Sequence, residues 1–187
     1  MRPCILALLL PALLAHAPAH ALPEGFRCVP EGAVLETSAG RTFRYHGADP
    51  ADPSVCLTTF WDGSRRRSAY GLWNLATPNA PDGPARVATL YPFAPGRTAE
   101  VTRLGMSTSQ HMSYAYRIVG ERRVQVPAGA FDTWVIEMTF RYFGQPPMTT
   151  VYTSYVDKQT RITVKLDVRS EVGRSADPSW EAVRITR

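Results

Sequence analysis

Lysine and cysteine are scarce in this chain, and long apolar runs are absent after residue 21. Of its 21 basic residues only Lys158 and Lys165 are lysines, so arginine carries the net charge of +5. Arginine dominance can reflect recognition of phosphate or carboxylate, or the coding bias of a GC-rich genome. The modest charge is spread along the chain, which is weak evidence for an acidic partner, and we expect no nucleic-acid partner. The missing apolar run excludes a membrane-spanning helix from residues 22–187, because such a helix needs about 20 apolar residues.

Sequence motifs of catalysis are also absent. The chain has no Gly-x-Ser-x-Gly elbow, His-Glu-x-x-His pair, phosphate loop or dinucleotide fingerprint. Beyond residue 21 its only histidines are His46 and His111, and His46 stands near Asp49 and Asp52, a set that could be taken for a metal site. A metal site needs three or four converging ligands, and a proline-rich turn with these residues is more often solvated. We therefore expect no catalytic residue, no metal, no cofactor and no enzyme activity.

Residues 1–21 have the three parts of a secretory signal peptide. Arg2 gives a short positive region, residues 5–14 form an apolar stretch interrupted only by Pro11, and Ala19-His20-Ala21 is a small-x-small cleavage site. About ten apolar residues are too few to span a bilayer. We expect cleavage of this peptide, export to the periplasm, and a single β-domain formed by residues 22–187.

Cleavage would remove Cys4 and leave Cys28 and Cys56. An even pair in an exported protein most simply forms a disulfide, and the absence of Cys-x-x-Cys spacing disfavours a reactive or metal-binding pair. The bridge would close a loop of about 29 residues and contribute roughly 3–4 kcal/mol. The residues before Cys4 and Cys28 differ from a lipid-attachment site, so we expect no lipid anchor.

Apolar and polar residues alternate from residue 102 onward, as in strands that bury one face. The alternation and the short connections predict successive antiparallel strands at residues 112–118, 134–142, 152–156, 162–168 and 180–185. In the loop Pro127-Ala128-Gly129, Gly129 is expected to take a positive φ. About eight to ten twisted strands would curl. The predicted fold is therefore all-β, a curved antiparallel meander sheet that forms a half-barrel or open barrel.

Residues 22–100 are less regular and are rich in proline, glycine, aspartate and alanine. Short strands are expected at residues 29–37, 41–46, 55–61 and 86–90. Loops are expected at residues 47–54 and 77–84, because the prolines there fix φ and remove backbone donors. No segment has a helical stripe of ten or more residues.

Three segments resemble a bacterial periplasmic family whose domain has no known function. Leu90 to Thr98 (LYPFAPGRT) resembles its FPL…GK segment, and Val124 to Phe131 (VQVPAGAF), after Val119-Gly120-Glu121, resembles its VPAGTF hairpin. Residues 152–164 resemble its closing strand pair, without the usual glycine in the turn. The resemblance covers about residues 85–170 and implies an exported half-barrel loosely similar to the lipoprotein carriers LolA and LolB. It implies no catalytic residue, since the shared residues are turn formers and core apolar residues.

Two clusters are candidate contact sites. Aromatic residues on consecutive strands are either ordinary core or the lining of a cavity for an apolar ligand: Tyr114, Tyr116, Trp134, Phe140, Tyr142, Tyr152 and Tyr155. Arg65, Arg66 and Arg67 could contact an anionic group, with Arg117 as a further arginine near the rim, although a solvated loop beside an edge strand is the favoured interpretation of this run.

These observations favour a periplasmic, non-enzymatic binding or envelope-associated module. Its partner would be an apolar or amphipathic ligand or an envelope protein. A carrier of lipid in a concave sheet is the first alternative. A hydrolase would need a convergent polar site, which the sequence does not show. A small outer-membrane barrel has the right strand alternation, but the chain ends Ile185-Thr186-Arg187 without a terminal aromatic residue and lacks two clear aromatic girdles.

Overall fold

The computed structural model describes residues 21–77, 80–103 and 111–186. All but the last residue of the predicted signal peptide lie outside these ranges, so its cleavage stays a prediction. Within them the chain forms one open sheet of 11 antiparallel strands and one helix of six residues. None of the described helices is long and apolar enough to span a membrane. The prediction of an all-β, curved antiparallel sheet is confirmed.

The sheet consists of two meanders that join through the strands nearest the two ends of the chain. The first meander contains β1 (Val34–Thr37), β2 (Thr42–Asp49), β3 (Asp52–Thr59), β4 (Arg65–Ala69) and β5 (Trp73–Asn74). The second contains β6 (Thr98–Arg103), β7 (Met112–Val126), β8 (Gly129–Tyr142), β9 (Met148–Asp157), β10 (Thr163–Val172) and β11 (Trp180–Thr186). Strand β1 pairs with β11, which gives the order β5-β4-β3-β2-β1-β11-β10-β9-β8-β7-β6.

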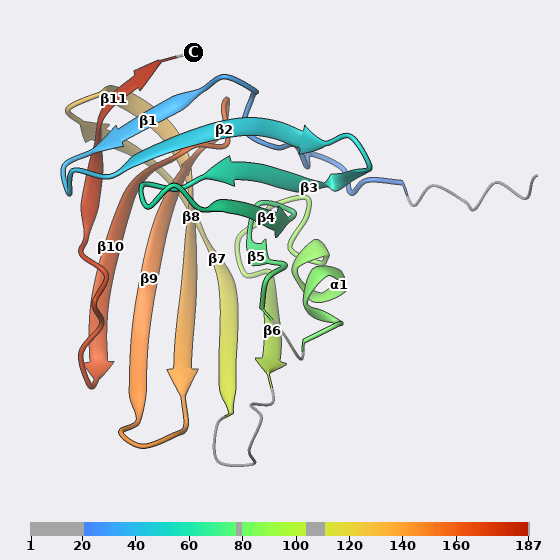
Figure 1. Ribbon diagram of the computed structural model, residues 1–187, viewed down its shortest axis with the longest axis vertical. Helices are drawn as coiled ribbons and strands as arrows, with labels where there is room; N and C mark the ends of the chain where they lie inside the picture. Colours follow the sequence, from blue (N-terminus) through green and yellow to red (C-terminus); the bar gives the residue numbers. More distant parts are fainter. Residues whose placement is uncertain (1–20, 78–79, 104–110, 187) are drawn as a thin grey trace, which may run out of the picture.

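The sheet bends so that the first meander crosses over the second. In Figure 1, β2, β3 and β4 lie across the upper part of β7–β10. The outer strands β5 and β6 are not hydrogen-bonded to one another, and the helix α1 (Gly83–Ala88) lies in the connection between them. The two crossing layers therefore face each other across a concave space.

Two apolar clusters hold the layers together. One contains Trp73 of β5, Val87 of α1, Leu90, and Tyr116 and Ile118 of β7. It closes the side on which the two sheet edges approach each other. The other cluster gathers residues of β1, β2, β10 and β11 with the end of the β7–β8 hairpin. The two clusters together stabilise the bend, and members of both line the space between the layers.

A bulge in β7 turns its last residues toward the second cluster. The pairing of β7 with β8 shifts register between Ile118 and Gly120, and Val126, beyond the shift, packs in the second cluster. At the tip, Ala128 N donates to Ala182 O of β11. Gly129 has φ +136°, which confirms the prediction of a positive φ.

Three expectations for the first half of the chain are wrong. Residues 86–90, expected as a strand, belong mostly to α1, because Pro84 presets the helical φ in the first turn and needs no donor there. Residues 47–54, expected as a loop, are mostly the ends of β2 and β3, because Asp49 accepts a hydrogen bond from Ala51 N and permits a tight turn. The arginine run Arg65–Arg67, expected in a solvated loop, opens strand β4.

Candidate functional site

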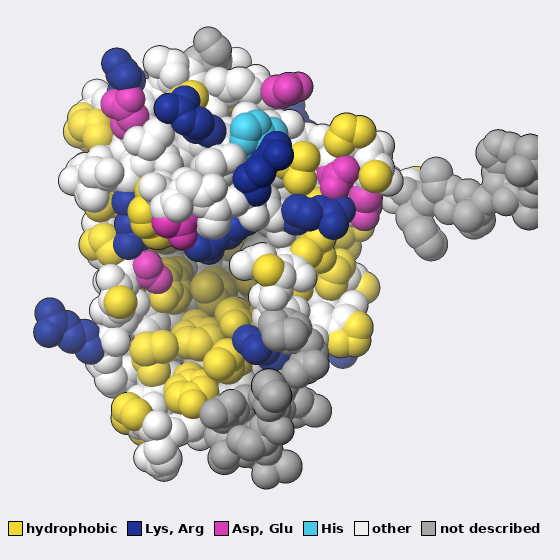
Figure 2. Space-filling model, in the orientation of Figure 1, with side chains coloured by type: hydrophobic (Ala, Val, Ile, Leu, Met, Phe, Trp, Pro, Cys, Tyr) yellow, Lys and Arg dark blue, Asp and Glu magenta, His cyan; other side chains and the backbone are white. Residues whose placement is uncertain are grey.

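A cavity of about 790 Å³ lies between the two layers of the bent sheet. Its floor is formed by side chains that project from the inner face of β7–β10: Tyr114, Tyr116, Ile136, Met138, Phe140, Tyr152, Ser154 and Leu166. They share this face because they alternate along their strands and stand opposite one another across the ladder, as Met138 does with Tyr152 and Ile136 with Ser154. Figure 2 shows this floor as a hollowed, largely hydrophobic surface below the strands of the first meander, which form the roof of the cavity.

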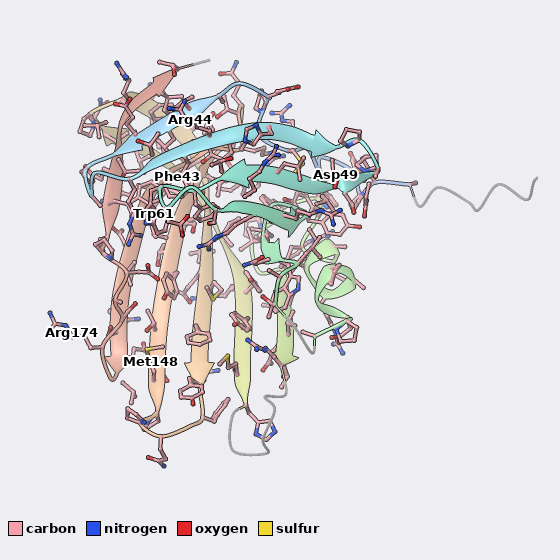
Figure 3. All side chains as sticks on the ribbon, in the orientation of Figure 1. Phe43, Arg44, Asp49, Trp61, Met148 and Arg174 are labelled. Carbon is pink, nitrogen blue, oxygen red and sulfur yellow. A yellow bond between two sulfur atoms is a disulfide. The ribbon has the colours of Figure 1, made fainter. Side chains whose placement is uncertain are left out.

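The roof comes from the first meander. Phe43 and Tyr45 of β2 and Leu57 of β3 contribute to the cavity lining, together with Phe60 and Trp61, which follow β3. The rings of Phe43 and Trp61 lie with centroids 5.3 Å apart, near the overhanging edge of the roof (Figure 3). The disulfide between Cys28 and Cys56 also lines the cavity, and its presence confirms the sequence prediction. The bridge ties the segment before β1 to β3.

The loop after α1 closes one side of the cavity. Tyr91 and Phe93 stack with ring centroids 4.2 Å apart and both contribute to the lining. Tyr91 Oη donates a hydrogen bond of 2.9 Å to Tyr70 O, and Arg97 Nη1 donates one of 3.2 Å to Thr89 O. These contacts hold a connecting loop against the sheet, so the side wall is a fixed part of the cavity.

Most tyrosine hydroxyls in the lining have partners within the protein. Tyr116 Oη donates to Leu72 O at 3.4 Å, and Tyr152 Oη donates to the Asp177 carboxylate at 3.2 Å. Burial raises the pKa of the phenols of Tyr45, Tyr91 and Tyr116 well above the ordinary value of a tyrosine. In the described ranges the Tyr45 hydroxyl has no such partner, which leaves it available to a bound molecule.

The charged lining is almost entirely cationic. Five arginines and one aspartate contribute to the cavity: Arg27, Arg41, Arg66, Arg67, Arg161 and Asp177. Three of the arginines lie near the roof with acidic neighbours. Arg41 contacts Asp177 at 3.5 Å, Arg66 contacts Asp62 at 3.7 Å, and Arg67 contacts Asp49 at 2.7 Å. Stacking also orients two of them, since Arg41 covers the Trp61 ring at 3.9 Å and Arg66 covers the Phe60 ring at 4.0 Å.

Arg161, in the turn between β9 and β10, differs from the other cationic lining residues. Its Nη2 donates to Gly25 O, whereas Nε and Nη1 are buried with no hydrogen-bond partner among the described residues. Burial lowers the pKa of this guanidinium from its usual value; nearby Arg27 also lowers the pKa, whereas Tyr91 and Asp157 raise it. The backbone of Arg161 has φ +66°, which an arginine rarely adopts.

The aromatic set predicted from the sequence divides between the cavity and other parts of the fold. Tyr114, Tyr116, Phe140 and Tyr152 line the cavity. The remaining three lie elsewhere. Trp134 packs against the first apolar cluster, and the Lys158 ammonium lies over its ring. Tyr142 lies against Gly144 at the end of β8. Tyr155 is buried in the second cluster, on the other face of β9.

The predicted arginine contacts also divide. Arg66 and Arg67 line the cavity, while Arg65 of the same strand is exposed and does not. Arg117 projects from the face of β7 opposite the cavity lining and pairs with Glu137 at 3.1 Å. Whether any of these residues contacts a ligand stays a prediction.

The residues considered for a metal site have structural partners. His46 Nε2 is hydrogen-bonded to Thr59 Oγ1 at 2.8 Å, Asp49 pairs with Arg67, and Asp52 accepts the Ser54 N–H at 3.0 Å. Across the described part of the chain, no three His, Cys, Asp or Glu residues converge as metal ligands would. The expected absence of a metal stays a prediction.

Several lining residues were not anticipated from the sequence. Phe43, Tyr45, Phe60, Tyr70 and Arg161 belong to the cavity, although nothing in the local pattern distinguished them from core or turn residues. Phe43 and Tyr45 alternate with polar neighbours in β2 and so carried a signal for one shared strand face. This face covers β7–β9 only because β1 pairs with β11, and that pairing joins residues far apart in the chain.

Comparison with known proteins gives similarities only among solved structures. No family model matches the chain, and no curated protein sequence matches it. A protein from Bacteroides fragilis, described as exported and as having a YmcC-like fold, is 16% identical with a TM-score of 0.45, covering 87% of this chain and 99% of its own. The hypothetical lipoprotein YmcC from Escherichia coli is 13% identical with a TM-score of 0.42, covering 82% of this chain and 81% of its own.

A protein from Parabacteroides distasonis, described as a lipoprotein, is 10% identical with a TM-score of 0.41, covering 86% of this chain and 98% of its own. These similarities carry no functional inference for this chain. The motif resemblance to a periplasmic family and the likeness to LolA and LolB are not shown by them.

Proposed function

We propose that this chain is an exported, non-enzymatic binding protein that holds an apolar or amphipathic ligand in the cavity between the two layers of its sheet. The observation that supports the proposal is the cavity itself. Its volume of about 790 Å³ is within the range of roughly 300–1,000 Å³ typical of small-molecule sites, and its lining is mostly aromatic and aliphatic.

The floor of the cavity favours an apolar ligand over a polar one. Met138, Phe140 and Tyr152 remain only half-buried although they lie between two protein layers. Removing apolar surface from water gains roughly 25 cal/mol per Å², so an acyl chain or ring system laid along this floor would bind favourably. Tyr45 and Ser154 add hydroxyl groups that could orient a polar part of such a ligand.

The polar groups of the lining favour binding over catalysis. Neither described histidine contributes to the cavity, and its one carboxylate, Asp177, is already paired with Arg41 and Tyr152. A hydrolytic site would bring a nucleophile and a base within hydrogen-bonding reach of each other. Asp177 and the arginines instead act as fixed charges around an apolar space.

A cavity-filling substitution tests this proposal. Ser154→Trp would place an indole over the floor between Ile136 and Leu166, whereas Thr153→Trp would place the same group on the opposite face of β9. A lipophilic dye that fluoresces in apolar surroundings should respond to wild type and to Thr153→Trp, and not to Ser154→Trp. Circular dichroism should show β-sheet in all three proteins.

The same experiment can contradict the proposal. If wild-type protein gives no dye response, the cavity does not bind apolar molecules. If Ser154→Trp and Thr153→Trp respond equally, the dye binds elsewhere on the surface, and the cavity has no part in it.

A further inference from the structure

We infer that the ligand is an anionic amphiphile whose carboxylate or phosphate group binds Arg161, where the turn between β9 and β10 borders the cavity. This inference rests on the proposed function and adds the charge and orientation of the ligand. Its basis is a guanidinium that borders an apolar cavity and lacks acceptors for part of its hydrogen-bonding capacity.

The surroundings of Arg161 leave its charge poorly compensated. A guanidinium carries five N–H donors. Of the three nitrogens in Arg161, only Nη2 has an acceptor among the described residues, the carbonyl oxygen of Gly25 at 2.6 Å. The ring of Phe93 lies 5.4 Å from the guanidinium carbon and gives a weak cation–π contact. Buried donors without acceptors are costly. Because Nε and Nη1 are buried, the side chain must turn toward the cavity that it lines before an anion can supply their acceptors, and an anion that did so would bind strongly.

Nearby charges increase the need for an anion. Arg27 also lines the cavity, and its guanidinium donates to the carbonyl oxygens of Lys158 and Gln159, in the same turn as Arg161. The nearest carboxylate on this turn is Asp157, whose Oδ2 already accepts hydrogen bonds from Thr160 N and Oγ1. Two arginines therefore share one corner of the cavity, and neither forms a salt bridge with a described carboxylate.

The arginines of the roof are placed differently. Arg41, Arg66 and Arg67 each have a carboxylate within 4 Å, and two of them stack on aromatic rings. Their charges are already compensated by protein groups. The least compensated charge lies instead near Tyr91 and Phe93, at the end of the cavity where β9 turns into β10.

This distribution of charge sets the orientation of the ligand. An anionic headgroup at Arg161 would place the attached chain along the aromatic floor, past Ile136 and Met138 toward Phe140. The chain would then cover the hydrophobic surface that Figure 2 shows below the roof. Carboxylate and phosphate both satisfy the geometry of a guanidinium, so both headgroups belong to the inferred class.

The test compares molecules that share one chain and differ in headgroup. Dissociation constants are measured for dodecanoate, dodecyl phosphate, dodecanol and dodecylammonium by displacement of the lipophilic dye. Wild-type protein should bind at least one of the two anionic compounds about tenfold or more tightly than dodecanol, the size expected for a charge-assisted hydrogen bond. The tighter of the two anions identifies the headgroup as carboxylate or phosphate.

Substitutions assign the preference to Arg161. Arg161→Gln should bind the anions and dodecanol with similar affinity, and Arg161→Lys should recover part of the preference. Arg65→Gln removes the same charge from an exposed position outside the cavity and should behave as wild type. Affinity for dodecanol reports whether each variant still has an intact cavity.

Different results contradict the two proposals. Equal binding of anionic and neutral compounds by wild type, or an anionic preference that survives in Arg161→Gln, would overturn the inference while leaving the binding function supported. Failure of wild type to bind any of the four compounds would overturn the binding function as well.

Discussion

The indole of Trp73 in β5 packs edge-on against the ring of Tyr114 in β7, with the two ring centroids 5.1 Å apart. The contact joins the edge strand β5 to β7, the neighbour of the opposite edge strand β6, and no backbone ladder connects these two sides of the open sheet. Gly83 makes it compatible with α1, because a Cβ at that position would lie 2.5 Å from the indole. Side-chain packing thus keeps the two layers facing each other around the cavity.

Loss of the Trp73 ring should therefore destabilise the protein strongly. Trp73 is only 2% exposed, and Trp73→Ala is expected to lower the free energy of unfolding by about 3–5 kcal/mol, as for other buried aromatic residues. Trp61→Ala removes the same side chain from a site that is 41% exposed and should cost clearly less. Urea unfolding followed by circular dichroism measures both. Equal losses would contradict the role given to Trp73.

The hairpin glycine gives a prediction about local backbone strain. Gly129 has φ +136°, a conformation that β-branched residues fit poorly, so Gly129→Val should lower the free energy of unfolding by at least about 1 kcal/mol. Ala130→Val, at the next and exposed position in β8, is the matched control and should change stability little. Wild-type stability in the Gly129 variant would show that this turn tolerates a side chain.

The disulfide should contribute to the stability of the roof. Because Cys28 and Cys56 are bonded, thiol labelling of protein purified without reductant should modify neither residue. Cys28→Ser is expected to reduce stability by about 2–5 kcal/mol. The double variant Cys28→Ser/Cys56→Ser should match the single variant, since both lack the same bridge. Labelling of both thiols in unreduced protein would contradict the bond.

Because several tyrosine hydroxyls are buried, we expect the folded protein to lose stability in alkaline solution. Burial raises the pKa of Tyr91 and Tyr116 in the folded chain, whereas a phenol in the unfolded chain ionises near pH 10. Below about pH 10 both states are protonated and stability is unaffected. Above it, ionisation favours the unfolded state, so the free energy of unfolding should fall as pH rises.

A tyrosine substitution isolates this effect. Tyr91→Phe should make the fall in unfolding free energy between about pH 9 and 11 shallower than in wild type, whatever its effect at neutral pH. Urea unfolding at several pH values gives the two slopes. Identical slopes would mean that the Tyr91 phenol is not protected from ionisation by the fold.

The strands of the second meander were predictable because they alternate apolar and polar residues over long stretches, as from Trp134 to Tyr142 in β8. Alternation also separates Tyr155 from Tyr152, because their odd spacing places them on opposite faces of β9, as the structure shows. Grouping the two in one aromatic set overlooked this spacing. In β7 the bulge at Gly120 reverses the pattern, and the glycine within the strand was the local signal that could have indicated it.

The cavity was less predictable than the strands because it depends on long-range pairing. Strand β1 meets β11 only after most of the chain has been made, and that pairing carries Phe43 and Tyr45 over the floor. The partly satisfied guanidinium of Arg161 lies where three segments meet, near Gly25, Phe93 and Asp157. In the sequence it was one arginine among many.

Native mass spectrometry of protein purified without detergent tests the central claim most directly. After incubation with dodecanoate, wild-type protein should carry one bound molecule, and Thr153→Trp should do the same. Ser154→Trp, whose cavity is filled, should appear as the bare chain under identical conditions. Bare wild-type protein, or equal loading of the Ser154 variant, would contradict the claim that the cavity between the two layers is a ligand site.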